Sequence, residues 1–385
     1  KATPDALAVK DRTHSLSYKA LDEAANRLAQ YLISEYQVAK GDNIALCLST
    51  NTDFMVALLA TLKTGACYIP VDPHYPAGRI QHILSDAQAR CIIAEACSTE
   101  HIISIDAQKL FIDSEQEAIA QQAATAPLVD IALDDALYTI YTSGSTGLPK
   151  GATVKQRGEL NLLQWYNREF SINATDKALI ISAIGFDLTQ KNLLGPLCAG
   201  ASVIFPELEV YDPQAALAII AEERATFINC APSAFYPLVE SPEHFADLSS
   251  LRLVLFGGEP IRMNALMAWL EDTQCAAQII NMYGPTECTD ISSFYRIEEP
   301  QRFLHEPMPI GHANDHVRLF IADNQLRLLP QGLVGELLVG GEGVGLGYRQ
   351  LPEMTAEKFI DHPIAGKVYR TGDLVKQRAD GEYVF

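Results

Sequence analysis

The sequence predicts an α/β protein with a β-rich C-terminal part, and three observations support this fold class. Up to about residue 250, strand-like runs such as NIALCL, CIIAEA, ALIISAI, ASVIF and LVLFGG alternate with longer segments. One of these, SYKALDEAANRLAQYLISEY, has the period of an amphipathic helix, with Leu21, Leu28 and Leu32 on one face. After about residue 315 the chain changes to short β runs with Gly turns, such as HVRLFIA and GELLVGG. We therefore expect α/β subdomains over about residues 1–315 and a β-rich lobe over about residues 316–385.

The composition excludes several classes of protein. With 385 residues, of which 48% are hydrophobic and 20% charged, the chain can form a globular core. Its net charge of −19 argues against a nucleic-acid partner, because phosphate backbones require basic surfaces. No apolar run approaches the roughly 20 residues of a membrane span, and no secretory signal opens the chain. The cysteines form no C-x-x-C pair and mostly lie in apolar runs, which indicates free thiols in a reducing cytoplasm.

The stretch YTSGSTGLPKG, residues 141–151, indicates an anion-binding loop. It connects two β-prone runs, ALYTIYT and GATVKQ, and its glycines allow backbone N–H groups to converge on a guest. Lys150 and the four hydroxyls add the donors and the positive charge with which proteins bind polyphosphates. The glycine-to-lysine spacing is not that of the G-x-x-x-x-G-K-[ST] loop. The alternative is an ordinary surface turn.

Three further clusters of polar residues and glycines end strand-like runs, where open α/β sheets bind ligands. They are LFGGEP at Leu255, NMYGPTE at Asn281 and YRTGDL at Tyr369. Each alone is typical of a turn or a helix cap. Together they supply an aromatic plane, an amide and two carboxylates, which are the groups needed to bind a nucleotide.

In their order along the chain, these motifs resemble the large N-terminal core of an adenylation domain from a non-ribosomal peptide synthetase. Such domains belong to the adenylate-forming superfamily, with the acyl-CoA ligases and firefly luciferase. The motifs are LSYKAL at Leu16, LKTGACYIPVDP at Leu62, LYTIYTSGSTGLPKG at Leu137, FDLT at Phe186, NMYGPTE at Asn281, GELLVGGEGVGLGYRQ at Gly335 and YRTGDL at Tyr369.

The resemblance implies that residues 1–385 form two α/β subdomains against a distorted β-barrel. In the family a small C-terminal lobe follows, with a lysine that contacts the substrate carboxylate and the α-phosphate. The ends of the chain, KATPDALAVKD and ADGEYVF, indicate a fragment that has been cut from a longer protein. The fragment stops before this lobe. We therefore expect the fragment to bind its substrates but to catalyse poorly.

The resemblance also implies a site for ATP and Mg²⁺. Thr286 would touch the α-phosphate, Glu287 would hold Mg²⁺ and Asp373 would bind the ribose hydroxyls. The expected catalytic residues are Thr142, Lys150, Thr286 and Glu287. The β- and γ-phosphates would be bound by Thr142, Ser143, Gly144, Ser145, Thr146, Gly147 and Lys150. The adenine would be bound by Gly258, Glu259, Pro260, Asn281, Tyr283 and Gly284.

In such domains an amino-acid carboxylate attacks the α-phosphorus, and pyrophosphate leaves. The aminoacyl group then passes to the phosphopantetheine thiol of a peptidyl carrier protein. The implied partners are this carrier protein, a neighbouring condensation domain and an MbtH-like protein. Two rival functions are an acyl- or aryl-CoA ligase and a catalytically silent nucleotide-binding module.

For the amino acid, the resemblance implies a side-chain pocket. Asp187 would pair with the α-ammonium group, which fatty-acyl-CoA ligases do not bind; the alternative is a helix cap. Lys191 needs a counter-charge, either a substrate carboxylate or Asp290. We expect glutamate, glutamine or aspartate as substrate, with a cationic or hydroxyl side chain facing Asp290 as the alternative. The pocket residues would be Phe186, Asp187, Leu188, Lys191, Asn229, Leu255, Gly257, Met282, Asp290 and Ile291.

Overall fold

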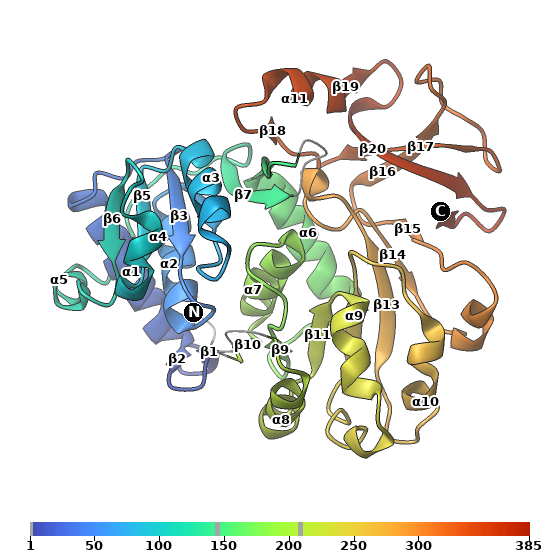
Figure 1. Cartoon of the computed structure of the whole chain (residues 1–385), viewed down its shortest axis with the longest axis horizontal. Helices are drawn as coiled ribbons and strands as arrows, with labels where there is room; N and C mark the ends of the chain where they lie inside the picture. The colour runs from blue at the N-terminus through green and yellow to red at the C-terminus, as the bar shows by residue number, and fades with distance from the viewer. Residues whose placement is uncertain (1–2, 143–146, 207–210) are drawn as a thin grey trace.

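The computed structural model describes residues 3–142, 147–206 and 211–385. Two large sheets stand side by side with helices between them, and a smaller sheet from the C-terminal part packs against both (Figure 1). The α/β fold class predicted from the sequence is confirmed.

The first large sheet is built mainly from parallel strands of the N-terminal part. Its strand order is β18-β8-β7-β4-β3-β5-β6, and only β8 and β18 run antiparallel to their neighbours. The strands are β3 (Asn43–Cys47), β4 (Cys67–Pro70), β5 (Cys91–Ala94), β6 (Gln108–Phe111), β7 (Ala136–Thr142), β8 (Lys150–Lys155) and β18 (Gly347–Tyr348). Its helices are α1 (Tyr18–Ser34), α2 (Thr52–Lys63), α3 (Ala77–Ala87), α4 (Thr99–Ile102) and α5 (Gln116–Ala120).

The second large sheet has the strand order β15-β14-β13-β12-β11-β9-β10-β1-β2. The N-terminal hairpin β1–β2 joins this sheet through β10, so the chain starts in one sheet and continues in the other. The strands are β1 (Leu7–Lys10), β2 (Ser15–Ser17), β9 (Lys177–Leu179), β10 (Ser202–Ile204), β11 (Phe227–Cys230), β12 (Leu253–Phe256), β13 (Gln278–Tyr283), β14 (Ser293–Arg296) and β15 (His312–Ala313). Its helices are α6 (Gln156–Glu169), α7 (Asp187–Ala199), α8 (Pro213–Glu223), α9 (Pro232–Phe235) and α10 (Met267–Leu270).

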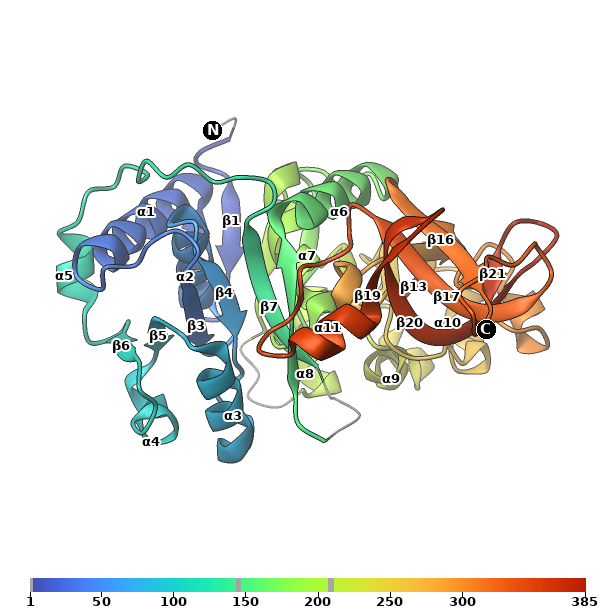
Figure 2. The same ribbon diagram turned by 90° about the horizontal axis from the view of Figure 1, so that it is seen from above.

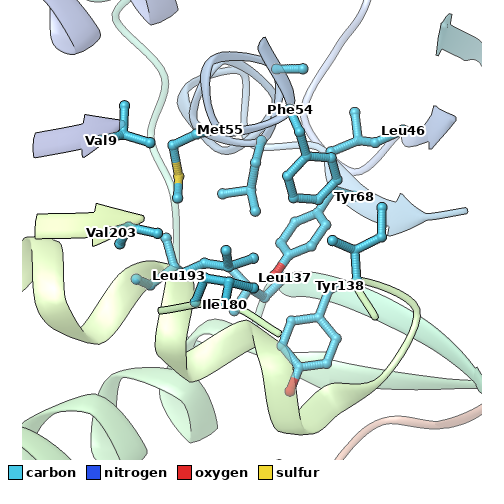
Figure 3. Packing of buried hydrophobic residues seen from close by; sticks show 14 of the residues in the cluster. Val9, Leu46, Phe54, Met55, Tyr68, Leu137, Tyr138, Ile180, Leu193 and Val203 are labelled. Atoms are coloured by element: carbon cyan, nitrogen blue, oxygen red, sulfur yellow. The ribbon is translucent and has the colours of Figure 1, made fainter. Parts of the chain in front are cut away.

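One apolar core joins the two large sheets (Figure 3). Ile44 and Leu46 of β3 point into it, whereas Ala45 and Cys47 point to the opposite face, which α3 covers. This alternation follows from the two-residue period of a strand, and both faces are apolar because helices cover both. Met55 of α2 lies in the core with residues of β1, β10 and α7, so the shared core fixes the position of one sheet relative to the other.

Local sequence signals explain where the core helices begin and end. Ser17 caps α1 by accepting the Ala20 N–H at 3.2 Å, and Asn51 caps α2 by accepting the Phe54 N–H at 3.1 Å. Helix α7 ends at Gly200, whose φ of +82° is the left-handed conformation that glycine adopts without strain.

The C-terminal sheet is open. Its order is β16-β17-β20-β19, with β21 paired to β20, and Figure 2 shows this lobe at the side of the molecule opposite α1. In the described part of the chain the edge strands do not pair with each other, so the expected distorted barrel does not close. One physical reason is that β18, from the same segment, pairs instead with β8 of the first sheet. The elements are β16 (Val317–Ala322), β17 (Val334–Gly341), α11 (Pro352–Lys358), β19 (Phe359–His362), β20 (Gly366–Gln377) and β21 (Tyr383–Val384).

Candidate functional site

A cavity of about 380 Å³ opens at the carboxyl ends of β11, β12 and β13, beside the start of α7. Ligands of open α/β sheets bind at this edge. Most residues expected to bind the amino acid line it: Phe186, Asp187, Leu188, Lys191, Gly257, Met282, Asp290 and Ile291. Residues expected to bind the nucleotide line it as well: Gly258, Glu259, Tyr283 and Gly284. The two predicted sites therefore meet in one cavity.

A larger cavity of about 530 Å³ adjoins the first along residues 181–183. It is lined by the segments after β3 and β4, and it contains none of the predicted site residues. We therefore place the chemistry in the smaller cavity.

Two predicted pocket residues do not line the cavity. Leu255 is completely buried in the core between the sheets. Asn229 lies behind Met282, with its amide 3.4 Å from the methionine sulfur, and its Oδ1 has no partner among the described residues. Their predicted contact with a substrate side chain stays a prediction.

Asp187 is the first residue of α7, and its carboxylate faces the cavity. Its Oδ1 accepts the N–H of the next residue, Leu188, at 2.8 Å, but the cap position of α7 is Phe186 and no side chain among the described residues caps this helix, so the capping alternative is wrong. Burial and the nearby negative charge of Asp290 raise the pKa of Asp187 to about 7; hydrogen bonds with Thr286 and Leu188 partly offset this shift. Because Thr286 is near enough to lower the pKa of Asp187, the predicted amino-acid pocket adjoins the predicted phosphate ligands.

The ammonium group of Lys191 forms a closed ion pair with Asp290 at the bottom of the cavity. The Nζ–Oδ2 distance is 2.5 Å, the lysine side chain is completely buried, and Nζ also donates to the carbonyl of Leu188 at 2.9 Å. The sequence left two candidate counter-charges for Lys191, a substrate carboxylate and Asp290. The structure shows that Asp290 fills this role. A buried lysine with this partner needs no charge from a substrate.

A buried carboxyl group that the sequence reasoning missed lies near this pair. Both oxygens of Glu159 in α6 lack a hydrogen-bond partner among the described residues. Burial and Asp290 raise the pKa of Glu159 to about 8, against the opposing effect of Lys191. Glu159 is therefore mainly protonated at neutral pH. In the sequence it looks like an ordinary polar residue at the start of a helix, so no local signal marks it.

The predicted phosphate and metal residues come together around a tyrosine. Lys150 lies 3.6 Å from Oε1 of Glu287, and the hydroxyl of Tyr348 lies between them. Lys150 donates to this hydroxyl at 2.9 Å, and the hydroxyl donates to Glu287 Oε1 at 2.5 Å. The hydroxyl of Tyr369 is 3.0 Å from that of Tyr348. Tyr348 belongs to the motif GLGYRQ, but a tyrosine in a short strand is usually a packing residue and was not predicted as functional.

The remaining nucleotide residues are placed as follows. Thr286 is buried at the start of a 3₁₀ turn (Thr286–Cys288), and Thr142 Oγ1 is buried without a partner among the described residues. Gly258, Glu259 and Pro260 are exposed in a row, with Glu259 accepting from the Ser233 hydroxyl at 2.9 Å. Gly147 is exposed. The predicted phosphate ligands outside the described residues are Ser143, Gly144, Ser145 and Thr146.

Two nucleotide residues have partners within the protein. The amide of Asn281 donates one of its two N–H groups to the carbonyl of Pro309 at 2.7 Å, and its expected contact with the adenine edge stays a prediction. The Tyr283 hydroxyl donates to Asp373 Oδ2 at 2.6 Å, and its ring packs edge-on against Phe385. The expected contacts of Tyr283 with adenine and of Asp373 with ribose stay predictions.

Gly284 explains how the NMYGPTE segment reaches the cavity. A Cβ at this position would lie 1.8 Å from the carbonyl oxygen of Asp290, so only glycine lets these two backbones approach so closely. This approach places Glu287, the predicted metal ligand, and Asp290, which lines the cavity, on one tight loop.

The acidic groups fit a magnesium ion held with a nucleotide. In the part of the chain that the structure describes, no group of three or more His, Cys, Asp or Glu residues could hold a metal by itself. Glu287 offers one carboxylate beside a lysine suited to phosphate, and Mg²⁺ is commonly bound by one or two carboxylates together with substrate phosphates.

Comparison with known proteins identifies the family. The model of the family described as "AMP-binding enzyme" matches residues 1–349. The chain belongs to this family of AMP-binding enzymes. Over 98% of its length it is 35% identical to a dimodular nonribosomal peptide synthase of Bacillus subtilis (strain 168), but it spans only 16% of that relative.

Solved structures agree with this family. The AMPPNP-bound form of the nonribosomal peptide synthetase FmoA3 is similar, with a TM-score of 0.90 and 28% identity. The match covers 99% of this AMP-binding enzyme and 41% of the FmoA3 chain. The N-terminal subdomain of Klebsiella oxytoca NpsA, in complex with 3-hydroxyanthranilyl-AMSN, matches 100% of the chain and 96% of its own, with a TM-score of 0.88 and 26% identity. The resemblance to the core of a peptide-synthetase adenylation domain is confirmed.

No helix among the described residues of this AMP-binding enzyme is long and apolar enough to cross a membrane.

The shifted carboxyl group of Glu159 predicts a pH dependence of stability. Its pKa rises from 4.5 to about 8 on folding, so the folded state binds more protons than the unfolded state between these pH values. Its contribution to stability therefore falls as pH rises through this window, by at most about 1.4 kcal/mol per pH unit. We expect Glu159→Gln to remove this loss. The free energy of unfolding of the variant minus that of the wild type should therefore increase from pH 5 to pH 8.

Urea unfolding at each pH measures this difference, and Glu117→Gln, an exposed glutamate, serves as the control that should follow the wild type. A constant difference between Glu159→Gln and the wild type across the range would contradict the prediction.

Proposed function

We propose that this chain activates an amino acid for non-ribosomal peptide synthesis. It binds an amino acid and Mg-ATP and forms the aminoacyl adenylate and pyrophosphate. The observation that carries this proposal is the meeting of two predicted sites in one cavity: Asp187, suited to an ammonium group, lines it together with Glu259 and Tyr283, which are predicted to bind adenine. The predicted phosphate and metal residues Lys150 and Glu287 lie 3.6 Å apart, and Glu287 is on the loop that also carries Asp290 of the cavity.

The chemistry asks mainly for positioning. A carboxylate oxygen of the amino acid attacks the α-phosphorus, and the bond to the bridging oxygen of the leaving pyrophosphate breaks. Asp187 binds the α-ammonium group and so orients the carboxylate, while Lys150 holds the outer phosphates. Glu287 would hold Mg²⁺, which would supply neutralisation of the charge on the departing pyrophosphate. Tyr283 and Asp373 complete the nucleotide site at the adenine and the ribose.

The product is an activated acyl group, so a thiol acceptor follows. We propose the phosphopantetheine arm of a peptidyl carrier protein, with a condensation domain and an MbtH-like protein as further partners. Support comes from the much longer peptide synthase relative, of which this chain spans 16%. Free cysteines, several of them buried, fit a reducing cytoplasm.

The charge balance of the pocket narrows the proposed substrate. Lys191 and Asp290 neutralise each other, and most of the other lining side chains are apolar, including Leu188, Met282 and Ile291. A charged substrate side chain would enter without an available counter-ion, at considerable cost. Among the substrates expected from the sequence, this favours glutamine over glutamate and aspartate.

One rival keeps a specific observation in its favour. The NpsA structure contains an aryl adenylate analogue, 3-hydroxyanthranilyl-AMSN, so a fold of this kind also accommodates aromatic acids. An aryl acid has no need of Asp187, however, because its ring carries no α-ammonium group.

Replacing Lys150 tests the nucleotide site. Lys150→Ala should weaken ATP binding much more than AMP binding, because AMP lacks the outer phosphates that this lysine holds. A charge-assisted phosphate contact contributes on the order of 1.5–3 kcal/mol. Titration calorimetry with each nucleotide measures both affinities, with the exposed-lysine variant Lys19→Ala as the control. Equal losses for ATP and AMP would sink the assignment.

Pyrophosphate exchange separates amino-acid activation from the rival. In a protein extended through the C-terminal lobe of the family, amino acids should drive exchange, whereas simple carboxylic and aryl acids should not. Asp187→Ala should remove the preference for an α-amino group, since it deletes the carboxylate that pairs with the ammonium. Exchange driven by aryl acids, and unaffected by Asp187→Ala, would favour the rival function.

Lys191 decides the charge of the side chain that is accepted. Lys191→Met preserves much of the side-chain volume but leaves Asp290 as an uncompensated anion. We expect exchange with lysine, ornithine or arginine to rise several-fold to a hundredfold relative to glutamine, the range for a buried charge pair. The double variant Lys191→Met/Asp290→Asn is the matched control and should lose this gain. An unchanged substrate profile in Lys191→Met would remove Lys191 from the pocket.

A further inference from the structure

We propose that Tyr348 is a positioning residue of the nucleotide site: its hydroxyl orients Glu287 toward the metal and holds the Lys150 ammonium group beyond hydrogen-bond distance from that carboxylate. This inference rests on the proposed roles of Glu287 and Lys150. It adds a residue from the far end of the chain, in β18, to a site otherwise formed by the segments after β7 and β13.

The backbone fixes the tyrosine ring. Strand β18 pairs with β8, where Tyr348 lies opposite Ala152, two residues after Lys150. The N–H of Tyr348 donates to the Thr355 hydroxyl at 2.9 Å, and Phe359 packs edge-on against the ring at 5.6 Å between centroids. The side chain is buried, so its hydroxyl has little freedom to search for other partners.

The direction of each hydrogen bond at this hydroxyl follows from the chemistry of its neighbours. Lys150 can only donate, and an ionised Glu287 can only accept. The single proton of Tyr348 therefore goes to Glu287, and its oxygen accepts from Lys150. The third contact, with Tyr369, requires that Tyr369 donates its proton to Tyr348. All donor and acceptor positions of the phenol are then used.

This arrangement leaves one carboxylate oxygen of Glu287 for a ligand. Tyr348 and Lys150 both approach Oε1. Within the described residues no hydrogen bond reaches Oε2. The phenol thus fixes the carboxylate through one oxygen and presents the other.

The hydroxyl also separates two opposite charges. Lys150 is 3.6 Å from Glu287 and rests over the face of the Tyr348 ring, 4.2 Å from its centre. Without the hydroxyl, Lys150 and Glu287 would lose the partner that they share and could approach each other to hydrogen-bond distance. That closer ion pair would compete with Mg²⁺ for the carboxylate and with phosphate for the lysine.

Tyr348→Phe tests the proposal because it removes only the hydroxyl and keeps the ring that Phe359 and Lys150 contact. We expect the Mg²⁺ concentration at half-maximal ATP binding to rise about tenfold, the loss typical of one hydrogen bond to a charged group. Titration calorimetry of ATP at stepped Mg²⁺ concentrations measures this midpoint. ATP binding without metal should change less than the midpoint does. A midpoint within twofold of the wild type would overturn the proposal.

Two controls make the result specific. Tyr383→Phe deletes another tyrosine hydroxyl, which donates to the Leu319 carbonyl in the C-terminal sheet, and it should leave the midpoint unchanged. Glu287→Gln tests the underlying metal assignment. If Glu287→Gln shifts the midpoint and Tyr348→Phe does not, only the role of Tyr348 falls; if neither shifts it, the metal site at Glu287 falls as well.

Discussion

The apolar layer between the two large sheets is the constraint on which the site depends. Ile44 and Leu46 from one sheet and Leu253 and Leu255 from the other face this layer, and helices α1, α2, α6 and α7 fill it. Because both sheets pack on the same helices, the carboxyl ends of their strands open at the same region of the molecule. Helix α7 belongs to this layer, and residues at its start also line the cavity. The predicted substrate-binding residues at the start of α7 are therefore held in place by the packing of the core.

Burial at this layer has a cost that the cavity residues have to offset. A buried charge requires a partner, and Lys191 and Asp290 supply one to each other. Asp187 and Glu159 respond differently: burial raises their pKa values, so each carries less negative charge near neutral pH than an exposed carboxyl group. These shifts reduce the negative charge of the buried carboxyl groups in the absence of a ligand. An α-ammonium group bound as proposed would favour ionisation of Asp187.

The sequence predicted much of this architecture because the relevant signals are local. Strand and helix periods fixed the α/β class, and the NMYGPTE and FDLT motifs named residues that meet in one cavity. What it could not predict depends on tertiary contacts. No local pattern shows that the side-chain amide of Asn281 donates to the carbonyl of Pro309, or that the side chain of Leu255 faces the core. Tyr348 was missed for the same reason, since its partners lie 61 and 198 residues away along the chain.

A single tight loop, residues 284–292, connects the proposed amino-acid pocket to the proposed metal site. It carries Glu287 and Asp290, and both Thr289 and Asp290 adopt left-handed backbone angles, with φ of 61° and 63°, that non-glycine residues rarely adopt. The loop holds this strain because the Thr289 hydroxyl donates to the carbonyl of Gly343 at 2.6 Å and the Ser292 N–H donates to that of Tyr283 at 2.8 Å. Since the backbone between Glu287 and Asp290 is fixed at both ends, a shift of Asp290 would also move the carboxylate of Glu287, the predicted metal ligand. The proposed substrate pocket and the proposed metal site are thus coupled through the geometry of this loop.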